Sequence, residues 1–62
     1  MSKAELVKLR VTELEKRGFE DAAAFAGLNL SAWARERLRR SARLELDDAG
    51  LPVPFLQNVR LG

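Results

Sequence analysis

The 62-residue sequence contains no cysteine, no histidine and no tyrosine. Without cysteine it has no disulfides or thiolate ligands, and without histidine it lacks the commonest general base and metal ligand. It has no glycine-rich phosphate loop either. A chain this short rarely encloses a cleft in which the surface carboxylates of Glu13, Glu15, Glu20 and Asp21 could do chemistry. We therefore expect no enzyme, no metal site and no cofactor.

Long hydrophobic runs are also missing, because Lys, Arg, Asp or Glu interrupts every apolar stretch. None approaches the roughly 18 to 20 residues that span a bilayer. No segment has the charged start, apolar stretch and small-residue cleavage site of a secretory signal. A basic helix lying on a membrane is disfavoured, because glutamates interrupt the arginines. The expectation is a cytoplasmic protein without a membrane partner.

Size and charge both point to association with other molecules. A single chain of this length buries only about 60% of the surface that its unfolded form exposes, so its own core is marginal. With disulfides and metals excluded, oligomerisation is the remaining source of stability. Eleven basic and nine acidic residues give a net charge of +2, and the isoelectric point of 9.7 makes nucleic-acid binding worth testing.

Apolar and charged residues alternate over 6–11, which reads LVKLRV. One parity carries Val7, Leu9 and Val11, and the other carries Lys8 and Arg10. A period of two predicts a short, half-buried strand. A strand needs a partner for its backbone N–H and C=O groups, and the sequence has no second segment with such alternation. The most economical partner is another copy of the chain.

Two helices are expected after this strand. Thr12 to Glu15 reads T-x-x-E, a capping box that predicts a helix over about 13–26, ended by Gly27. A second helix is expected over about 30–49, capped by Asn29 or Ser31 and stopped by Gly50 and Pro52. We assign 1–50 to one domain and 51–62 to an apolar tail that contains both prolines. Gly18 weakens the first helix, and close approach of another backbone is the only reason we find for it.

The strings VKLRVTELE and GLNLSAWARERLRRSA resemble the ribbon-helix-helix family of bacterial and phage repressors, the Arc, MetJ and CopG type. The resemblance covers roughly 6–50. It implies a mostly α fold with one N-terminal strand and two helices per chain. It also implies an intertwined homodimer, in which an intermolecular antiparallel two-stranded ribbon enters the major groove of duplex DNA. The sequence departs from the pattern at Asn29, where a small hydroxyl residue is expected, and at Ala34, where a larger aliphatic residue is usual.

The same resemblance implies three sets of site residues. The DNA base contacts fall on Leu6, Lys8 and Arg10. The DNA phosphate contacts fall on Lys3, Leu28, Asn29, Leu30 and Ser31. The dimer core falls on Val7, Leu9, Val11, Leu14, Phe25, Leu30, Trp33, Ala34 and Leu38. The chemistry is suitable, because Arg and Lys can donate to guanine and the amides at a helix start favour an anion.

The resemblance implies a sequence-specific transcriptional repressor of a bacterium, plasmid or phage, associated with the nucleoid in the cytoplasm. It leaves open a plasmid-transfer accessory protein. The alternative is a protein-interaction module or antitoxin whose tail, 51–62, binds a partner protein. The arginine run from Arg35 to Arg43 favours a solvated helix face, with Glu36 pairing to Arg39 or Arg40, over a second phosphate-binding surface.

Overall fold

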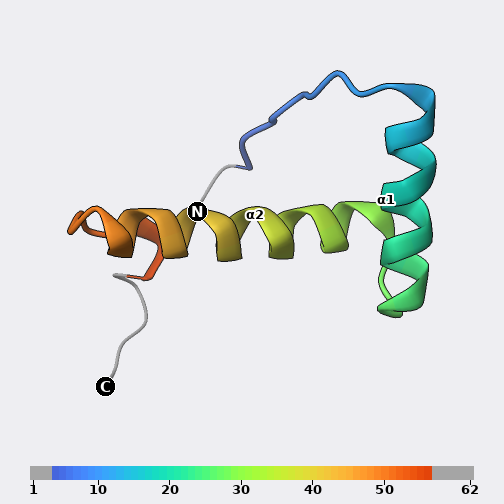
Figure 1. Cartoon of the computed structure of the whole chain (residues 1–62). Helices are drawn as coiled ribbons and strands as arrows, with labels where there is room; N and C mark the ends of the chain where they lie inside the picture. Colours follow the sequence, from blue (N-terminus) through green and yellow to red (C-terminus); the bar gives the residue numbers. More distant parts are fainter. Residues whose placement is uncertain (1–3, 57–62) are drawn as a thin grey trace.

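The computed structural model describes residues 4–56, which form two α-helices and one turn of 3-10 helix (Figure 1). Helix α1 spans Glu13–Phe25, helix α2 spans Leu30–Asp48, and the 3-10 turn η1 spans Pro54–Leu56. Residues 4–12 carry no regular secondary structure and follow an extended path (Figure 1). Figure 1 shows α2 running crosswise to α1 and beginning beside it, with the segment before α1 leading away from the start of that helix.

The fold class predicted from the sequence, a ribbon-helix-helix chain with a strand over 6–11, is wrong. Between residues 4 and 56 the protein has two helices and no strand. The alternation of apolar and charged residues is compatible with an extended backbone, and 6–11 is extended. A strand also requires a neighbouring backbone to pair with its N–H and C=O groups, and no described segment supplies one. The described chain is a small two-helix protein.

Helix α1 is fixed at both ends by local hydrogen bonds. The hydroxyl of Thr12 accepts from the N–H of Glu15 at 3.0 Å, and the Glu15 carboxylate accepts from the N–H of Thr12 at 2.8 Å. This is the capping box that the T-x-x-E pattern predicts. At the other end Gly27 has φ 76°, and the N–H of Leu28 donates to the carbonyl of Ala23 at 2.9 Å. This left-handed glycine ends the helix and satisfies its last carbonyls.

Helix α2 begins and ends in the same way. The side chain of Asn29 accepts from the N–H of Ala32 at 2.8 Å, so Asn29 is the cap. Gly50 has φ 74°, and the N–H of Leu51 donates to the carbonyl of Leu46 at 2.9 Å. The chain then turns back, which leaves Val53 only 7% exposed. The helix bounds differ from the predicted 13–26 and 30–49 only at the C-terminal ends.

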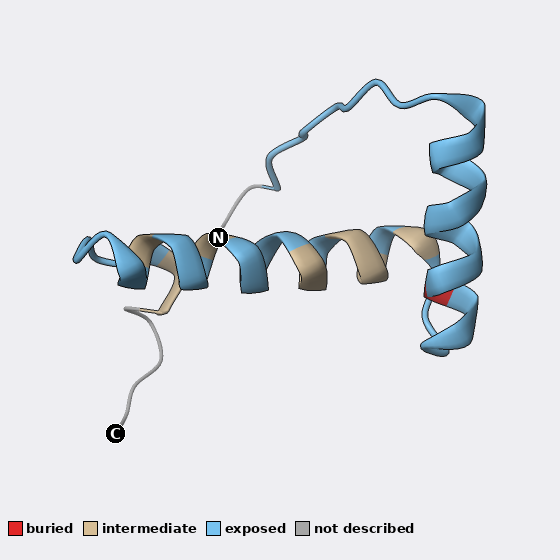
Figure 2. Cartoon of the chain, viewed as in Figure 1, coloured by how far each residue is buried: buried red, intermediate tan, exposed pale blue. Residues whose placement is uncertain are grey.

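The core of the chain is minimal. Among residues 4–56 only Ala23, 2% exposed, and Val53 are buried (Figure 2). The radius of gyration of 14.2 Å exceeds the value of about 10.6 Å expected for a compact domain of this length. A single copy therefore leaves most of its apolar side chains in water.

The first testable prediction concerns Gly18, in the middle of α1. A Cβ built on Gly18 meets no atom within 4 Å, so the described chain has room for a side chain there. We expect Gly18→Ala to raise the free energy of unfolding by about 1 kcal/mol, because alanine loses less backbone entropy in a helix. Urea denaturation followed by circular dichroism measures the change.

The matched control is Gly27→Ala. At φ 76° a Cβ is strained, and the substitution should lower the free energy of unfolding by about 1 to 2 kcal/mol. A loss of stability in Gly18→Ala would contradict the open space at Gly18 and indicate that another backbone approaches it closely.

Candidate interaction surface

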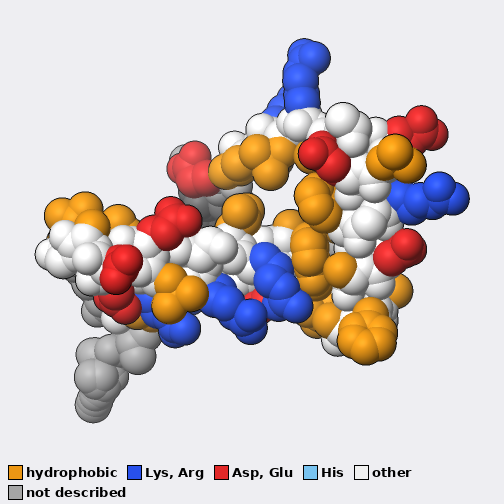
Figure 3. Space-filling model, viewed as in Figure 1, with side chains coloured by type: hydrophobic (Ala, Val, Ile, Leu, Met, Phe, Trp, Pro, Cys, Tyr) orange, Lys and Arg blue, Asp and Glu red, His pale blue; other side chains and the backbone are white. Residues whose placement is uncertain are grey.

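A hollow of about 490 Å³ lies between the extended segment and the two helices. We call it the apolar hollow. Its lining residues are Leu9, Val11, Lys16, Phe19, Leu30, Trp33, Ala34, Arg37 and Leu38. Figure 3 shows hydrophobic side chains gathered around an opening in this face of the molecule. Three segments of the chain thus contribute apolar groups to one concave surface.

Trp33 is held within this surface by two aromatic contacts. Its ring stacks on Phe19, with 5.6 Å between the ring centroids and 29° between the planes. The guanidinium of Arg37 lies 5.5 Å from the centroid of the Trp33 ring, in cation–π geometry. The Nε1 atom of Trp33 is shielded from solvent and has no hydrogen-bond partner among the described residues. A shielded indole N–H without an acceptor costs free energy. An acceptor supplied by a partner molecule would remove that cost.

The apolar hollow is accompanied by a large excess of exposed surface. The chain exposes 5728 Å², whereas a compact monomer of 7.0 kDa exposes about 4,000 Å². A standard protein–protein interface buries about 800 Å² on each partner. The excess is therefore large enough to supply one such interface. Much of it is apolar: Leu9, for example, is 67% exposed.

The residues predicted to contact DNA bases lie on the extended segment. Leu6, Lys8 and Arg10 are all exposed, and none of them lines the apolar hollow. Leu9 and Val11, which alternate with them, do line it. Neither Lys8 nor Arg10 forms an ion pair with another described residue. The alternation in the sequence thus separates Leu9 and Val11 from Lys8 and Arg10, although residues 4–56 contain no strand.

The residues predicted to contact phosphate lie at the start of α2, except for Lys3, which is outside the described residues. The N–H of Leu28 is already bonded to α1, and the Oδ1 atom of Asn29 is used in capping. No described group accepts from the N–H of Leu30 or Ser31. These two amides are the ones that remain for an anion, at the positive end of the α2 dipole.

The residues predicted for the dimer core divide into two groups. Leu9, Val11, Leu30, Trp33, Ala34 and Leu38 all line the apolar hollow. Val7, Leu14 and Phe25 lie outside it, and Phe25 is 95% exposed. The predicted list omitted Phe19, which the structure places against Trp33. Its position in the apolar stripe of α1, three and four residues before Ala22 and Ala23, is the signal that could have identified it.

Charged groups along α2 are partly paired. The Glu36 carboxylate accepts from Arg40 at 3.3 Å and also from the neighbouring Arg37. Across residues 4–56 no group of three acidic side chains could hold a metal ion. Within the same range, neither helix combines the length and the apolar character that crossing a bilayer would require.

The second testable prediction concerns the start of α2. Asn29→Ala removes the side-chain acceptor for the N–H of Ala32, and we expect it to lower the free energy of unfolding by about 1 kcal/mol. Ser31→Ala is the matched control, because no capping bond involves the Ser31 side chain, and its effect should be within about 0.5 kcal/mol. Thermal denaturation of both variants decides: an equal loss in both would contradict Asn29 as the cap.

Comparisons with protein-family models, with curated proteins and with solved structures find no match for this chain. The resemblance to ribbon-helix-helix proteins therefore stays a prediction, and its strand is absent from the described chain. What the chain does is inferred from the apolar hollow and from the placement of its basic side chains.

Proposed function

We propose that this chain works as a homodimer that binds duplex DNA, with Lys8 and Arg10 reading bases and Leu6 making apolar contact with them. One observation carries the proposal: the extended segment places Leu9 and Val11 in the apolar hollow and leaves the alternating Lys8 and Arg10 outside it. A partner that covers the hollow would therefore hold the extended segment in place and leave its basic side chains exposed. Dimerisation and DNA binding would then depend on alternate residues of the same segment.

The case for a second copy rests on area and composition. The exposed surface exceeds the compact-monomer value by more than one partner's share of a standard interface. Burying apolar area stabilises an assembly by roughly 25 cal/mol per Å². A second copy presents the same apolar face, so two chains can cover each other with one contact related by two-fold symmetry.

The case for DNA rests on which side chains remain outside the hollow. An arginine can place two donors on O6 and N7 of guanine, a lysine can reach the same acceptors, and an apolar side chain can touch the thymine methyl. Arg10, Lys8 and Leu6 supply these three groups at alternate positions. A dimer doubles the set, which suits a short palindromic site. The amides of Leu30 and Ser31 would bind a backbone phosphate and fix the register.

The third prediction tests assembly. Leu38→Asp places a charge in the apolar hollow, and we expect it to weaken self-association at least tenfold, since burying one leucine is worth about 1.5 to 3 kcal/mol. Leu44→Asp is the matched control: Leu44 lies on the same helix, is 58% exposed against 54% for Leu38, and does not line the hollow. Sedimentation equilibrium measures both variants. A monomeric wild-type protein would overturn the homodimer.

The fourth prediction tests DNA binding. If a dimer neutralises about four to six phosphates, the logarithm of the affinity falls with the logarithm of salt concentration at a slope of about −4 to −5. Fluorescence anisotropy of a labelled random-sequence duplex measures the slope, and a flat response would contradict the proposal. On a selected site, Arg10→Ala should cost about 1 to 3 kcal/mol and relax base choice. Arg17→Ala, on α1, is the control and should leave base choice unchanged.

A protein partner on the same surface is the second candidate function. The apolar hollow itself favours it, because the hollow fits an apolar segment of another protein as well as it fits a second copy. Of the tail predicted to bind a partner, 51–62, residues 57–62 lie outside the described residues, and in the described part Val53 is buried and Phe55 and Leu56 are half-buried on their own chain. A monomer that ignores DNA at low salt would select this function.

A further inference from the structure

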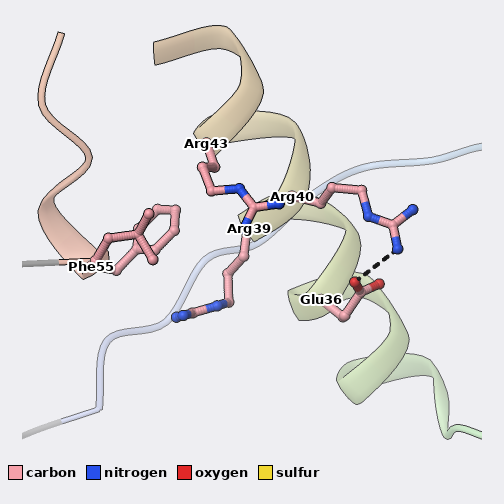
Figure 4. A pocket seen from close by; sticks show the side chains of 6 residues that line it. Glu36, Arg39, Arg40, Arg43 and Phe55 are labelled. Atoms are coloured by element: carbon pink, nitrogen blue, oxygen red, sulfur yellow. Dashed lines mark hydrogen bonds and ion pairs between the residues drawn. The ribbon is translucent and has the colours of Figure 1, made fainter. Parts of the chain in front are cut away.

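A second hollow lies further along α2, where η1 folds back against the helix. It has a volume of about 230 Å³, and its lining residues are Glu36, Arg39, Arg40, Arg43, Phe55 and Leu56. We call it the arginine hollow. Figure 4 shows Arg39, Arg40 and Arg43 extending from one stretch of α2, with Arg40 directed toward Glu36 and Phe55 entering from the returning chain.

Positive charge in the arginine hollow is not balanced by the described residues. Three guanidinium groups and a single carboxylate, that of Glu36, line the hollow, and Glu36 pairs with Arg40 and with Arg37 outside the hollow. Arg39 and Arg43 form no ion pair with any residue between 4 and 56. They are four residues apart, a spacing at which like charges on one helix face repel each other. An anion between them would remove that repulsion.

Phe55 holds one of these guanidinium groups, that of Arg39, in place. The guanidinium carbon of Arg39 lies 4.6 Å from the centroid of the Phe55 ring, within cation–π distance. The ring is held there because Val53 is buried and the N–H of Leu56 donates to the Val53 carbonyl at 3.0 Å. An arginine that is already positioned loses less side-chain entropy when it binds a ligand.

We propose that the arginine hollow is a binding site for a phosphate group. A planar guanidinium presents paired donors that match the oxygens of a phosphate, and two guanidinium groups that form no ion pair with residues 4–56 lie at one small concave site. The source we argue for is the backbone of duplex DNA, and that step rests on the proposed function. The hollow then extends the DNA footprint beyond the extended segment and the start of α2. Free phosphate is the other source with the same chemistry.

The test uses full-length protein in two measurements. In the first, the Nε–Hε resonances of the arginines are followed by NMR during titration with inorganic phosphate, with a short duplex and with an oligoglutamate peptide. In the second, the salt dependence of duplex binding is compared for wild type, Arg39→Gln, Arg43→Gln and Arg17→Gln. Arg17→Gln removes the same charge from α1, outside the arginine hollow. Circular dichroism checks folding, and Arg39→Lys keeps the charge while removing the paired donors.

The expected result is a saturable shift of the Arg39 and Arg43 resonances with phosphate and duplex, without a shift of Arg17. The magnitude of the salt slope should fall by about 2 in Arg39→Gln and Arg43→Gln, since a dimer carries two hollows and each phosphate contributes about 0.9. Arg17→Gln should keep the wild-type slope. Arg39→Lys should lose affinity with little change in slope, because its charge is retained.

Three other outcomes would overturn the proposal or part of it. Unshifted Arg39 and Arg43 resonances with both phosphate and duplex would overturn the site, and an equal response to oligoglutamate would overturn its preference for phosphate. Shifts with inorganic phosphate alone, beside wild-type slopes in every variant, would overturn DNA as the source and support a free-phosphate site. Failure of the proposed function has a separate result, because wild-type protein would then show no salt-dependent binding of duplex DNA. The phosphate titration would still show whether the arginine hollow binds phosphate.

Discussion

The constraint on which the rest of this structure depends is that one chain cannot bury its own apolar side chains. Helix α1 is about 20 Å long and helix α2 about 28 Å long at 1.5 Å per residue. Residues 26–29 connect α1 to α2, so the helices lie close together where α2 begins and diverge from there (Figure 1). Two diverging helices enclose little volume. The consequence is a surface that exposes Leu9, Leu38 and part of Phe19.

Because the core is so small, the ends of the helices are fixed mainly by local interactions. The capping box at Thr12, the side-chain cap at Asn29 and the left-handed glycines at Gly27 and Gly50 each involve residues within a few positions of one another. Such interactions form without a tertiary core, and short residue patterns in the sequence predict them. This is why the two helices could be predicted closely from T-x-x-E, from Asn29 and from the two glycines.

The prediction of a strand over 6–11 was wrong because a strand depends on more than local interactions. Alternation reports which side chains share a face of an extended segment, whereas a strand is defined by a neighbouring backbone that the segment itself does not encode. The alternation did predict that Leu9 and Val11 would lie apart from Lys8 and Arg10. The sequence did not predict the contact of Phe19 with Trp33 or the arginine hollow, because both arise from contacts between residues far apart in the chain. The approach of Phe55 to Arg39 joins residues sixteen positions apart, and no local pattern specifies it.

The two hollows on this chain differ in the physics of what they can bind. The apolar hollow is lined mostly by apolar side chains, together with Lys16 and Arg37, so its occupancy depends on removing apolar area from water and is little affected by moderate salt. The arginine hollow has guanidinium groups that exceed its carboxylates, so its occupancy depends on charge and weakens as salt screens it. Salt therefore separates the two contributions. Arg37 connects the two hollows, because it contacts Trp33 of the apolar hollow and Glu36 of the arginine hollow. Covering Trp33 would therefore change the surroundings of the Glu36 carboxylate, which also pairs with Arg40.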